Sequence, residues 1–352
     1  MGKASWHRAA FFLLGIFCSL TLTIVGIGGH TARWFIRKDI QRFGELYNCC
    51  KISIFKIPLP VIGYPIEIPD HPISESEIIF MGDSYFGNFY GKTFEKKTGV
   101  PIFGIRLKRD QNPLEALEAL QYKPNGKQKY LIFESVERNL QYGLRDGLLK
   151  DKKSLPFFEG INQTIKDYMI NADKLEYFVS ENQFMNKFIE ARNTLRFFVF
   201  NDISKMTPVY SVVPPMLYSK WSVDGNRLVK TDEDIKKIAN KIEEIASELK
   251  LRYGLTMIFF PIPNKYSLYG YDYTKYKYNT QGESYDNFLP LLQWKLEERS
   301  VLTIDLYHLF LNSKDPVFEP TNDHWNARGM KLGLNNLTSM YYSLTMYSGS
   351  RK

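Results

Sequence analysis

The 352-residue sequence is poor in the residues that bind metals or form cross-links, with only three cysteines and five histidines. Three cysteines without a Cys-x-x-Cys pair build neither a disulfide framework nor a zinc finger. Cys18 falls in an apolar run, and Cys49 and Cys50 are adjacent, a spacing that strains an intramolecular bond. We therefore predict structural cysteines, which leave the redox compartment open.

Long basic blocks, RNA-binding aromatic signatures and internal repeats are also lacking. The formal net charge is nevertheless +8, which suits an anionic lipid, an acidic polymer or a nucleic acid as a neighbour. Without a basic block, we expect no nucleic acid partner. Aromatic residues make up 15% of the chain; those outside the core suit a sugar-stacking surface or a membrane interface.

One apolar run has the length of a membrane span. Ala9–Gly28 contains no charged residue, and about 20 residues at 1.5 Å each reach roughly 30 Å, the thickness of the hydrocarbon layer. The best signal-cleavage position, after Ala32, has His30 at −3, so we expect an uncleaved anchor over residues 1–30. The basic residues after the run favour a cytoplasmic location for the rest of the chain; they are Arg33, Arg37, Lys38 and Arg42.

Two further segments follow the predicted anchor. Residues 31–74 are expected to form a juxtamembrane segment and a linker, because prolines recur closely between Pro58 and Pro72. A larger domain then spans residues 75–345. Its apolar runs of strand length are Ile78–Met81, Tyr130–Phe133, Leu255–Phe260 and Val301–Ile304.

Helical patterns alternate with these runs. The clearest covers Asp232–Arg252, where an isoleucine stripe is preceded by the capping-box pair Thr231 and Asp234 and followed by Gly254. A second pattern covers Pro113–Gln121. The alternation predicts an α/β domain with a doubly wound, mostly parallel sheet. Residues 150–230 exceed the length of one crossover, so we expect a helical insertion within the same domain.

A candidate nucleophile follows the first predicted strand. Reactive groups of open α/β sheets gather beyond the C-terminal ends of the strands, and Gly82-Asp83-Ser84 lies there. Gly82 permits a sharp turn, and Ser84 would begin a helix whose free N–H groups hold a developing oxyanion. The tripeptide taken alone also fits an ordinary helix N-cap.

A serine nucleophile needs a base, and few histidines are present. Outside the N-terminal segment only His71, His308 and His324 occur. His71 lies in the proline-rich entry and His308 directly follows a strand, whereas His324 lies in the polar motif Asn322-Asp323-His324-Trp325. We therefore predict Ser84 as the nucleophile and His324 as its base.

These motifs resemble a known superfamily. The strand into Gly82–Gly87 and the late His324-Trp325-Asn326-x-x-Gly329 are similar to the SGNH/GDSL hydrolases, specifically the DHHW and alginate O-acetyltransferase-like branches. Glu134–Arg138 and Pro261–Tyr266 resemble the Glu-x-x-x-Arg and Pro-x-x-Lys-x-x-x-Tyr segments of those proteins. The resemblance covers about residues 75–340 and implies an SGNH-type fold.

The resemblance also suggests residues around the nucleophile. The usual SGNH oxyanion hole takes a glycine and an asparagine from later loops, for which Gly104 and Asn139 are candidates. Glu134 and Arg138 fit either a role at the site or a buried ion pair that supports it. A tyrosine-rich loop over residues 266–278 fits a sugar-stacking lid or an ordinary packed loop. The predicted substrate-side residues are Tyr85, Arg138, Lys265, Tyr269 and Trp325.

The chain departs from the alginate branch in two respects. That branch carries its Asp-His motif before the serine, and it has Asp two positions before the His, where this chain has Asn322. The residue that orients His324 is therefore Asp323, Asn322 or Asp305. We favour Asp323, since a carboxylate stabilises an imidazolium better than an amide does.

The function that the resemblance implies is a membrane-anchored serine O-acyltransferase with no metal or cofactor. It would move an acyl group, most simply acetyl, through Ser84 to a cell-envelope or extracellular polysaccharide, on the extracytoplasmic side of the cell membrane. A polytopic membrane O-acyltransferase would supply the acyl group as a partner. The alternatives are a carbohydrate or lipid esterase of the same fold and a non-catalytic scaffold.

Overall fold

A computed structural model describes residues 42–59, 71–83, 85, 90–107, 111–126, 129–141, 183–227, 230–270, 275–276 and 287–349. The predicted anchor over residues 1–30 lies outside these ranges, as does much of the predicted linker. Within the described ranges, no helix combines the length and apolar character that a membrane span requires.

The chain divides into two compact units. The smaller unit takes Met1–Leu59 and Lys152–Ile203, and the larger takes Pro60–Asp151 and Ser204–Lys352. We expected residues 150–230 to form one insertion in the α/β domain, but the first part of this segment groups with the N-terminal residues instead. Its second part was expected to be helical and contains a β-hairpin.

The described part of the smaller unit is helical. It comprises α3 (Glu45–Cys50), the 3-10 helix η1 (Ser53–Phe55) and α8 (Gln183–Phe200). Phe55 and Phe197 pack edge to face with ring centroids 5.8 Å apart. Cys49 and Cys50 are free thiols, and burial raises the pKa of Cys50 to about 12.

The larger unit is built on a five-stranded parallel sheet of order β2-β1-β3-β6-β8. The strands are β1 (Ile78–Gly82), β2 (Ile102–Arg106), β3 (Tyr130–Val136), β6 (Thr256–Ile262) and β8 (Leu302–Thr303). The predicted α/β class with a mostly parallel sheet is thereby confirmed. Strand order reverses direction between β1 and β3, and ligands of such sheets bind at this switch point.

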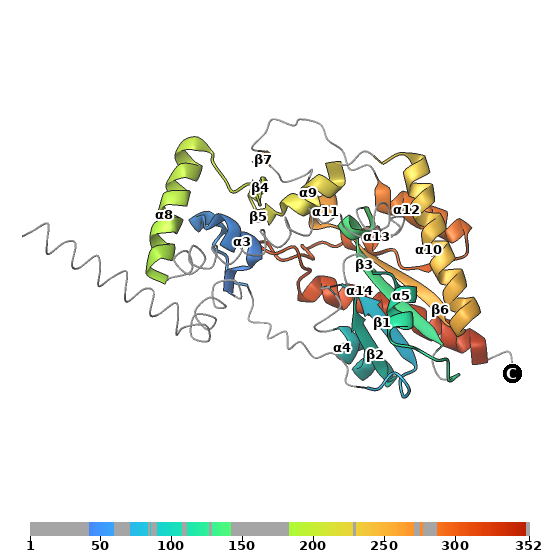
Figure 1. Cartoon of the computed structure of the whole chain (residues 1–352). Helices are drawn as coiled ribbons and strands as arrows, with labels where there is room; N and C mark the ends of the chain where they lie inside the picture. Colours follow the sequence, from blue (N-terminus) through green and yellow to red (C-terminus); the bar gives the residue numbers. More distant parts are fainter. Residues whose placement is uncertain are drawn as a thin grey trace, which may run out of the picture. The chain divides into compact units, whose positions relative to one another are not determined.

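Helices cover both faces of this sheet (Figure 1). On one face α4 (Tyr90–Thr98) packs against α14 (Ala327–Gly349), and α14 also contacts α13 (Leu306–Leu311). On the other face α10 (Asp232–Tyr253) contacts α5 (Pro113–Ala119) and α12 (Phe288–Glu298). Because both faces are covered, β1 and β3 are buried along their whole length, which explains their continuous apolar runs.

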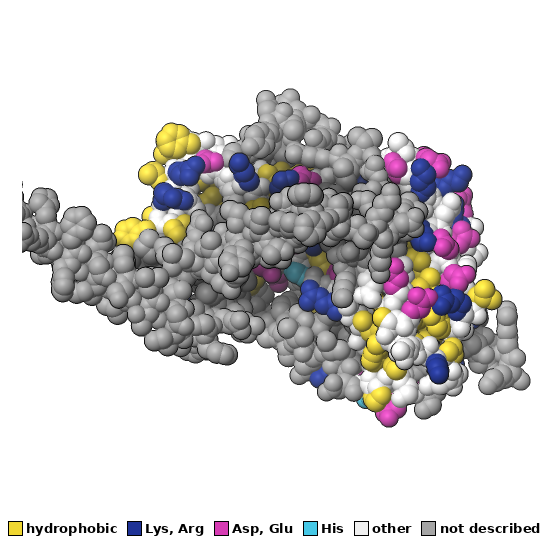
Figure 2. Space-filling model, viewed as in Figure 1, with side chains coloured by type: hydrophobic (Ala, Val, Ile, Leu, Met, Phe, Trp, Pro, Cys, Tyr) yellow, Lys and Arg dark blue, Asp and Glu magenta, His cyan; other side chains and the backbone are white. Residues whose placement is uncertain are grey.

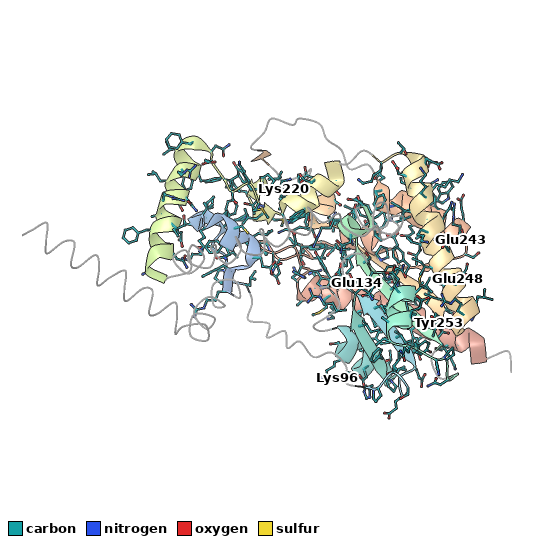
Figure 3. The ribbon with its side chains drawn as sticks, viewed as in Figure 1. Lys96, Glu134, Lys220, Glu243, Glu248 and Tyr253 are labelled. Atoms are coloured by element: carbon teal, nitrogen blue, oxygen red, sulfur yellow. The ribbon has the colours of Figure 1, made fainter. Side chains whose placement is uncertain are left out.

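Helix α10 follows its sequence signals closely. Thr231 and Asp234 make the predicted capping box, and Gly254 ends the helix in the left-handed conformation at φ 70°. The isoleucine stripe faces the core, whereas Glu243 and Glu248 lie on the outer side of the helix (Figure 3). The stripe and both helix ends are therefore confirmed.

A second, three-stranded antiparallel sheet of order β5-β4-β7 was not predicted. It comprises β4 (Val209–Val212), β5 (Pro215–Tyr218) and β7 (Lys275–Tyr276). Helix α9 (Lys220–Arg227) follows β5 in the chain, and α11 (Lys265–Tyr269) precedes β7. Both α11 and α6 (Glu137–Asn139) contact α9. Leu217 N donates to Pro320 O at 2.9 Å, so β5 supports the loop that carries His324.

Candidate active site

The turn after β1 is fixed by a glycine and a buried carboxylate. Glu134, labelled in Figure 3, comes from the neighbouring strand β3, and its Oε2 accepts from the backbone N–H of Asp83 at 2.7 Å. A Cβ atom on Gly82 would lie only 2.2 Å from that oxygen. Gly82 is therefore required for close approach of Glu134 as well as for turning the chain.

Asp83 ties the ends of β1 and β3 together. Its Oδ1 accepts from Tyr85 N at 3.0 Å, and its Oδ2 accepts from Val136 N at 3.3 Å and Asn139 Nδ2 at 2.9 Å. No role for Asp83 was predicted from the sequence. The residues on both sides of Ser84 thus belong to this network, while Ser84 itself lies outside the described residues.

His324 lies beside the residue that follows Ser84. The imidazole ring of His324 and the phenol ring of Tyr85 have centroids 4.6 Å apart at an interplanar angle of 33°. The Tyr85 hydroxyl donates to the backbone carbonyl of Asp323. The fold therefore brings together two predicted site segments that are 238 residues apart in sequence.

Asn322 sets the tautomer of His324. Its Oδ1 accepts from the backbone N–H of His324 at 3.2 Å and lies 2.8 Å from Nδ1 of the same residue. Because a backbone N–H only donates, the atom that meets it must be the amide oxygen. Nδ1 must then carry the proton, which leaves the lone pair of a neutral imidazole on Nε2, the atom a general base uses.

Asp323 does not occupy the orienting position that we favoured for it. Its carboxylate turns toward Arg138, with Nη1 4.0 Å from Oδ2, and toward Ser222, whose Oγ lies 3.5 Å from Oδ2. The third candidate, Asp305, caps α13 through His308 N at 2.9 Å and contacts the His308 ring at 2.6 Å. The amide of Asn322 therefore holds the imidazole.

Arg138 contacts Tyr85 and Asp323 rather than pairing with Glu134. Its Nη1 lies 3.5 Å from the Tyr85 hydroxyl, and its guanidinium carbon lies 5.7 Å from the Tyr85 ring centroid. Burial would lower the pKa of Arg138, but Tyr85 and Asp323 outweigh this and raise it, so the guanidinium stays charged. Burial raises the pKa of Tyr85, whose hydroxyl stays neutral.

Lys265 stabilises the loop that carries His324 through its backbone carbonyls. The side chain is fully buried, and Nζ contacts four backbone carbonyls at 2.6–3.2 Å, those of Leu217, Glu319, Pro320 and Asn322. Burial lowers the pKa of Lys265 to about 7, against the opposing effect of the Asp323 and Glu319 carboxylates. Lys265 thus stabilises the loop through backbone carbonyls, and its predicted contact with substrate stays a prediction.

The late motif is structural on both sides of His324. Trp325 is buried and packs edge to face against Tyr85 at 5.8 Å and Phe260 at 6.3 Å, so it belongs to the core beside the site. Asn326 Oδ1 accepts from the N–H groups of Arg328 and Gly329, both at 3.0 Å, at the start of α14. A Cβ on Gly329 would lie 2.3 Å from Val317 O, so this position requires glycine.

The remaining predicted residues divide between the site and its surroundings. Asn139 lies at the site, where its side chain donates a hydrogen bond to Asp83. Gly104 instead pairs with Phe80 inside the sheet, and Phe80 precedes Gly82 by two residues. Tyr269 is half-buried, and its hydroxyl accepts from Val317 N at 2.9 Å, so it packs against the loop. Of the proposed tyrosine lid, Tyr266 is fully buried, and Tyr271, Tyr273 and Tyr278 lie outside the described residues.

In comparisons with protein-family models, curated proteins and solved structures, nothing matches this chain. The family resemblance thus stays an expectation, and the functional argument depends on the geometry of the site.

The close approach of Gly82 to Glu134 predicts a coupled pair of substitutions. Gly82→Ala should destabilise the protein by on the order of 1–3 kcal/mol, because the added methyl overlaps the buried carboxylate. In a Glu134→Ala background the same substitution should be markedly milder. Urea unfolding of the four proteins measures the coupling; an equal loss in both backgrounds would contradict this packing.

The burial of Lys265 predicts a stability that depends on pH. Its pKa is about 7 in the folded protein and about 10.4 in an unfolded chain. Between these values the unfolded state binds more protons, so the free energy of unfolding should rise with pH, by at most ~1.4 kcal/mol per pH unit. Lys265→Met should lack this rise. Equal slopes for the two proteins over pH 7–10 would show that the carbonyls keep Lys265 charged.

Proposed function

We propose that this chain is a serine acyl-transfer enzyme, in which Ser84 is the nucleophile and His324 the base. The observation that carries the proposal is the 2.8 Å contact of Asn322 Oδ1 with Nδ1 of His324, whose ring lies beside the residue that follows Ser84. A neutral imidazole with its lone pair on Nε2 is the form that accepts a serine proton. A purely structural histidine does not require a fixed tautomer next to a predicted nucleophile.

The proposed reaction has two half-reactions, acylation of Ser84 and transfer of the acyl group to an acceptor. The Oγ of Ser84 attacks an ester carbonyl carbon while its proton moves to Nε2 of His324, and the leaving alcohol departs with that proton as the ester C–O bond breaks. An acceptor hydroxyl then attacks the acyl-serine carbonyl carbon while its proton moves to Nε2. The bond from the acyl carbon to Oγ of Ser84 breaks, and Oγ takes the proton from Nε2, which restores Ser84 and His324. The second amide N–H of Asn139 is a candidate donor to the oxyanion.

The finer assignment follows from the family resemblance and the N-terminal apolar run. We propose an acetyl group as the acyl group, a cell-envelope polysaccharide as acceptor, and a membrane-anchored domain outside the cytoplasm. The donor partner would be a polytopic membrane O-acyltransferase. With water as acceptor, the same residues would make an esterase, and the two functions differ only in which acceptor hydroxyl is used.

The assignment of the nucleophile and base is tested by turnover of 4-nitrophenyl acetate. Ser84→Ala and His324→Ala should each lower kcat/KM by ~10³-fold or more, because members of such a unit fail together. Added polysaccharide should gain acetyl groups if the chain is a transferase, whereas release of acetate alone would identify an esterase. Near-normal turnover by Ser84→Ala would contradict the proposal, and a turnover-deficient wild type would indicate a scaffold.

The role of Asn322 is tested by two substitutions at that position. Asn322→Ala should lower kcat by on the order of 10²-fold, since the imidazole loses the group that fixes its tautomer. Asn322→Asp should keep substantial activity and raise the pKa seen in the pH profile of kcat, because a carboxylate stabilises the imidazolium. Asp323→Asn is the matched control and should leave that pKa in place. A shift with Asp323→Asn alone would contradict the assignment.

A further inference from the structure

Helix α8 of the smaller unit turns polar side chains inward. Glu190 accepts from the Tyr47 hydroxyl at 2.8 Å and from Lys56 Nζ at 2.5 Å. Asn186, Asn193 and Thr194 also bond to the neighbouring segment, through Lys51 Nζ at 2.7 Å, Cys50 O at 2.8 Å and Ser53 N at 3.0 Å. These positions recur at the i, i+4, i+7, i+8 spacing of one helix face. A mainly polar stripe therefore occupies the side where a water-exposed helix normally packs its apolar residues.

The opposite face of α8 exposes large apolar side chains. Their relative exposures are Phe188 59%, Leu195 64%, Phe198 65%, Val199 59% and Phe200 73%. At about 100° per residue, Phe188, Leu195 and Val199 lie along one line, with Phe198 beside it. Figure 2 shows the yellow hydrophobic side chains at the place of α8 in Figure 1. Apart from the buried Phe197, the helix is therefore mainly polar inside and apolar outside, the reverse of the usual arrangement in water.

Basic residues border this apolar face. At the same helical angle, Lys187 lies on one flank, and Arg192 and Arg196 lie on the other. The one acidic residue of α8, Glu190, is turned inward, while Arg196 also pairs with Asp202. In Figure 2 dark blue side chains lie among the yellow ones of α8. A strip of Phe, Leu and Val flanked by Lys and Arg is typical of helices at a membrane surface.

Charge decides between the possible occupants of this face. A second copy of the helix would bring the basic flanks of two molecules together, and such like charges repel. An anionic lipid surface instead pairs phosphates with the flanks and acyl chains with the apolar strip. The uncharged run Ala9–Gly28 has the length of a membrane span, which is consistent with a bilayer as the neighbour.

We propose that the exposed face of α8 lies at the boundary between headgroups and acyl chains of an anionic lipid bilayer. Phe188, Leu195, Phe198 and Val199 enter the apolar layer. Lys187 and Arg192 reach back to lipid phosphates on either side. This surface is independent of the catalytic proposal, because no residue of the Ser84 and His324 site takes part in it.

The test uses the full chain reconstituted into vesicles of phosphatidylcholine and phosphatidylglycerol at about 3:1 that carry a photoactivatable phospholipid. After irradiation, mass spectrometry locates lipid adducts along the chain. Adducts are expected over residues 186–200. The internal control is the larger unit, where Trp294 is 54% and Leu251 81% exposed without an apolar strip of this kind, and few adducts are expected. Vesicles of phosphatidylcholine alone should lower α8 labelling several-fold.

The matched variant is Leu195→Ser with Phe198→Ser. Both side chains are exposed, so a thermal melt should be unchanged, while adducts over α8 should fall at least ~5-fold. Equal labelling of α8 and of the Trp294 region would overturn the proposal. So would failure of the chain to float with the vesicles, or recovery of α8 crosslinked to a second copy or another protein in place of lipid.

Discussion

The candidate site depends on one buried lysine side chain, that of Lys265. Nζ of Lys265 contacts backbone carbonyls of β5 and of the loop that carries His324. That loop has little regular structure of its own. A lysine is seldom fully buried without several acceptors, and here the backbone supplies them. With Lys265 in place, the turn at Asn322 is defined, and Asn322 in turn defines the ring of His324. The position of the His324 ring therefore depends on a buried lysine that acts through the backbone of the loop.

A second set of contacts fixes the other half of the site. The Glu134 carboxylate accepts a hydrogen bond from the backbone N–H of Asp83. The Asp83 carboxylate in turn accepts hydrogen bonds from Tyr85, Val136 and Asn139. These hydrogen bonds join the ends of β1 and β3 at the switch point of the sheet, where open α/β folds bind their ligands. The tyrosine ring then meets His324. The two halves of the site are thereby brought into contact through Tyr85.

The sequence predicted those parts of the fold that depend on periodicity. Strand β1 and helix α10 were identified because central parallel strands are continuously apolar and a half-buried helix has a stripe. Strand β2 was missed, since Gly104 interrupts a short and only partly buried run. The hairpin of β4 and β5 was missed because each strand has only four residues and Pro215 begins the second.

For the candidate site, the sequence suggested residues but not the contacts between them. Ser84 and His324 followed from the scarcity of histidine and from two motifs, but the choice of Asp323 over Asn322 followed from chemistry alone. Which of the two faces the imidazole depends on the backbone turn, and Lys265 sets that turn from 57 residues away. The polar interior of α8 was likewise missed, because its partners lie more than 130 residues earlier in the chain.

The central claim is that Ser84 is an activated nucleophile, and covalent labelling tests it most directly. Purified protein is treated with a fluorophosphonate probe, and the modified residue is located by mass spectrometry. We expect one modified serine, Ser84, with labelling slowed at least ~10²-fold in His324→Ala. No labelling of the folded wild type, or labelling of another serine at a rate unaffected by His324→Ala, would contradict it.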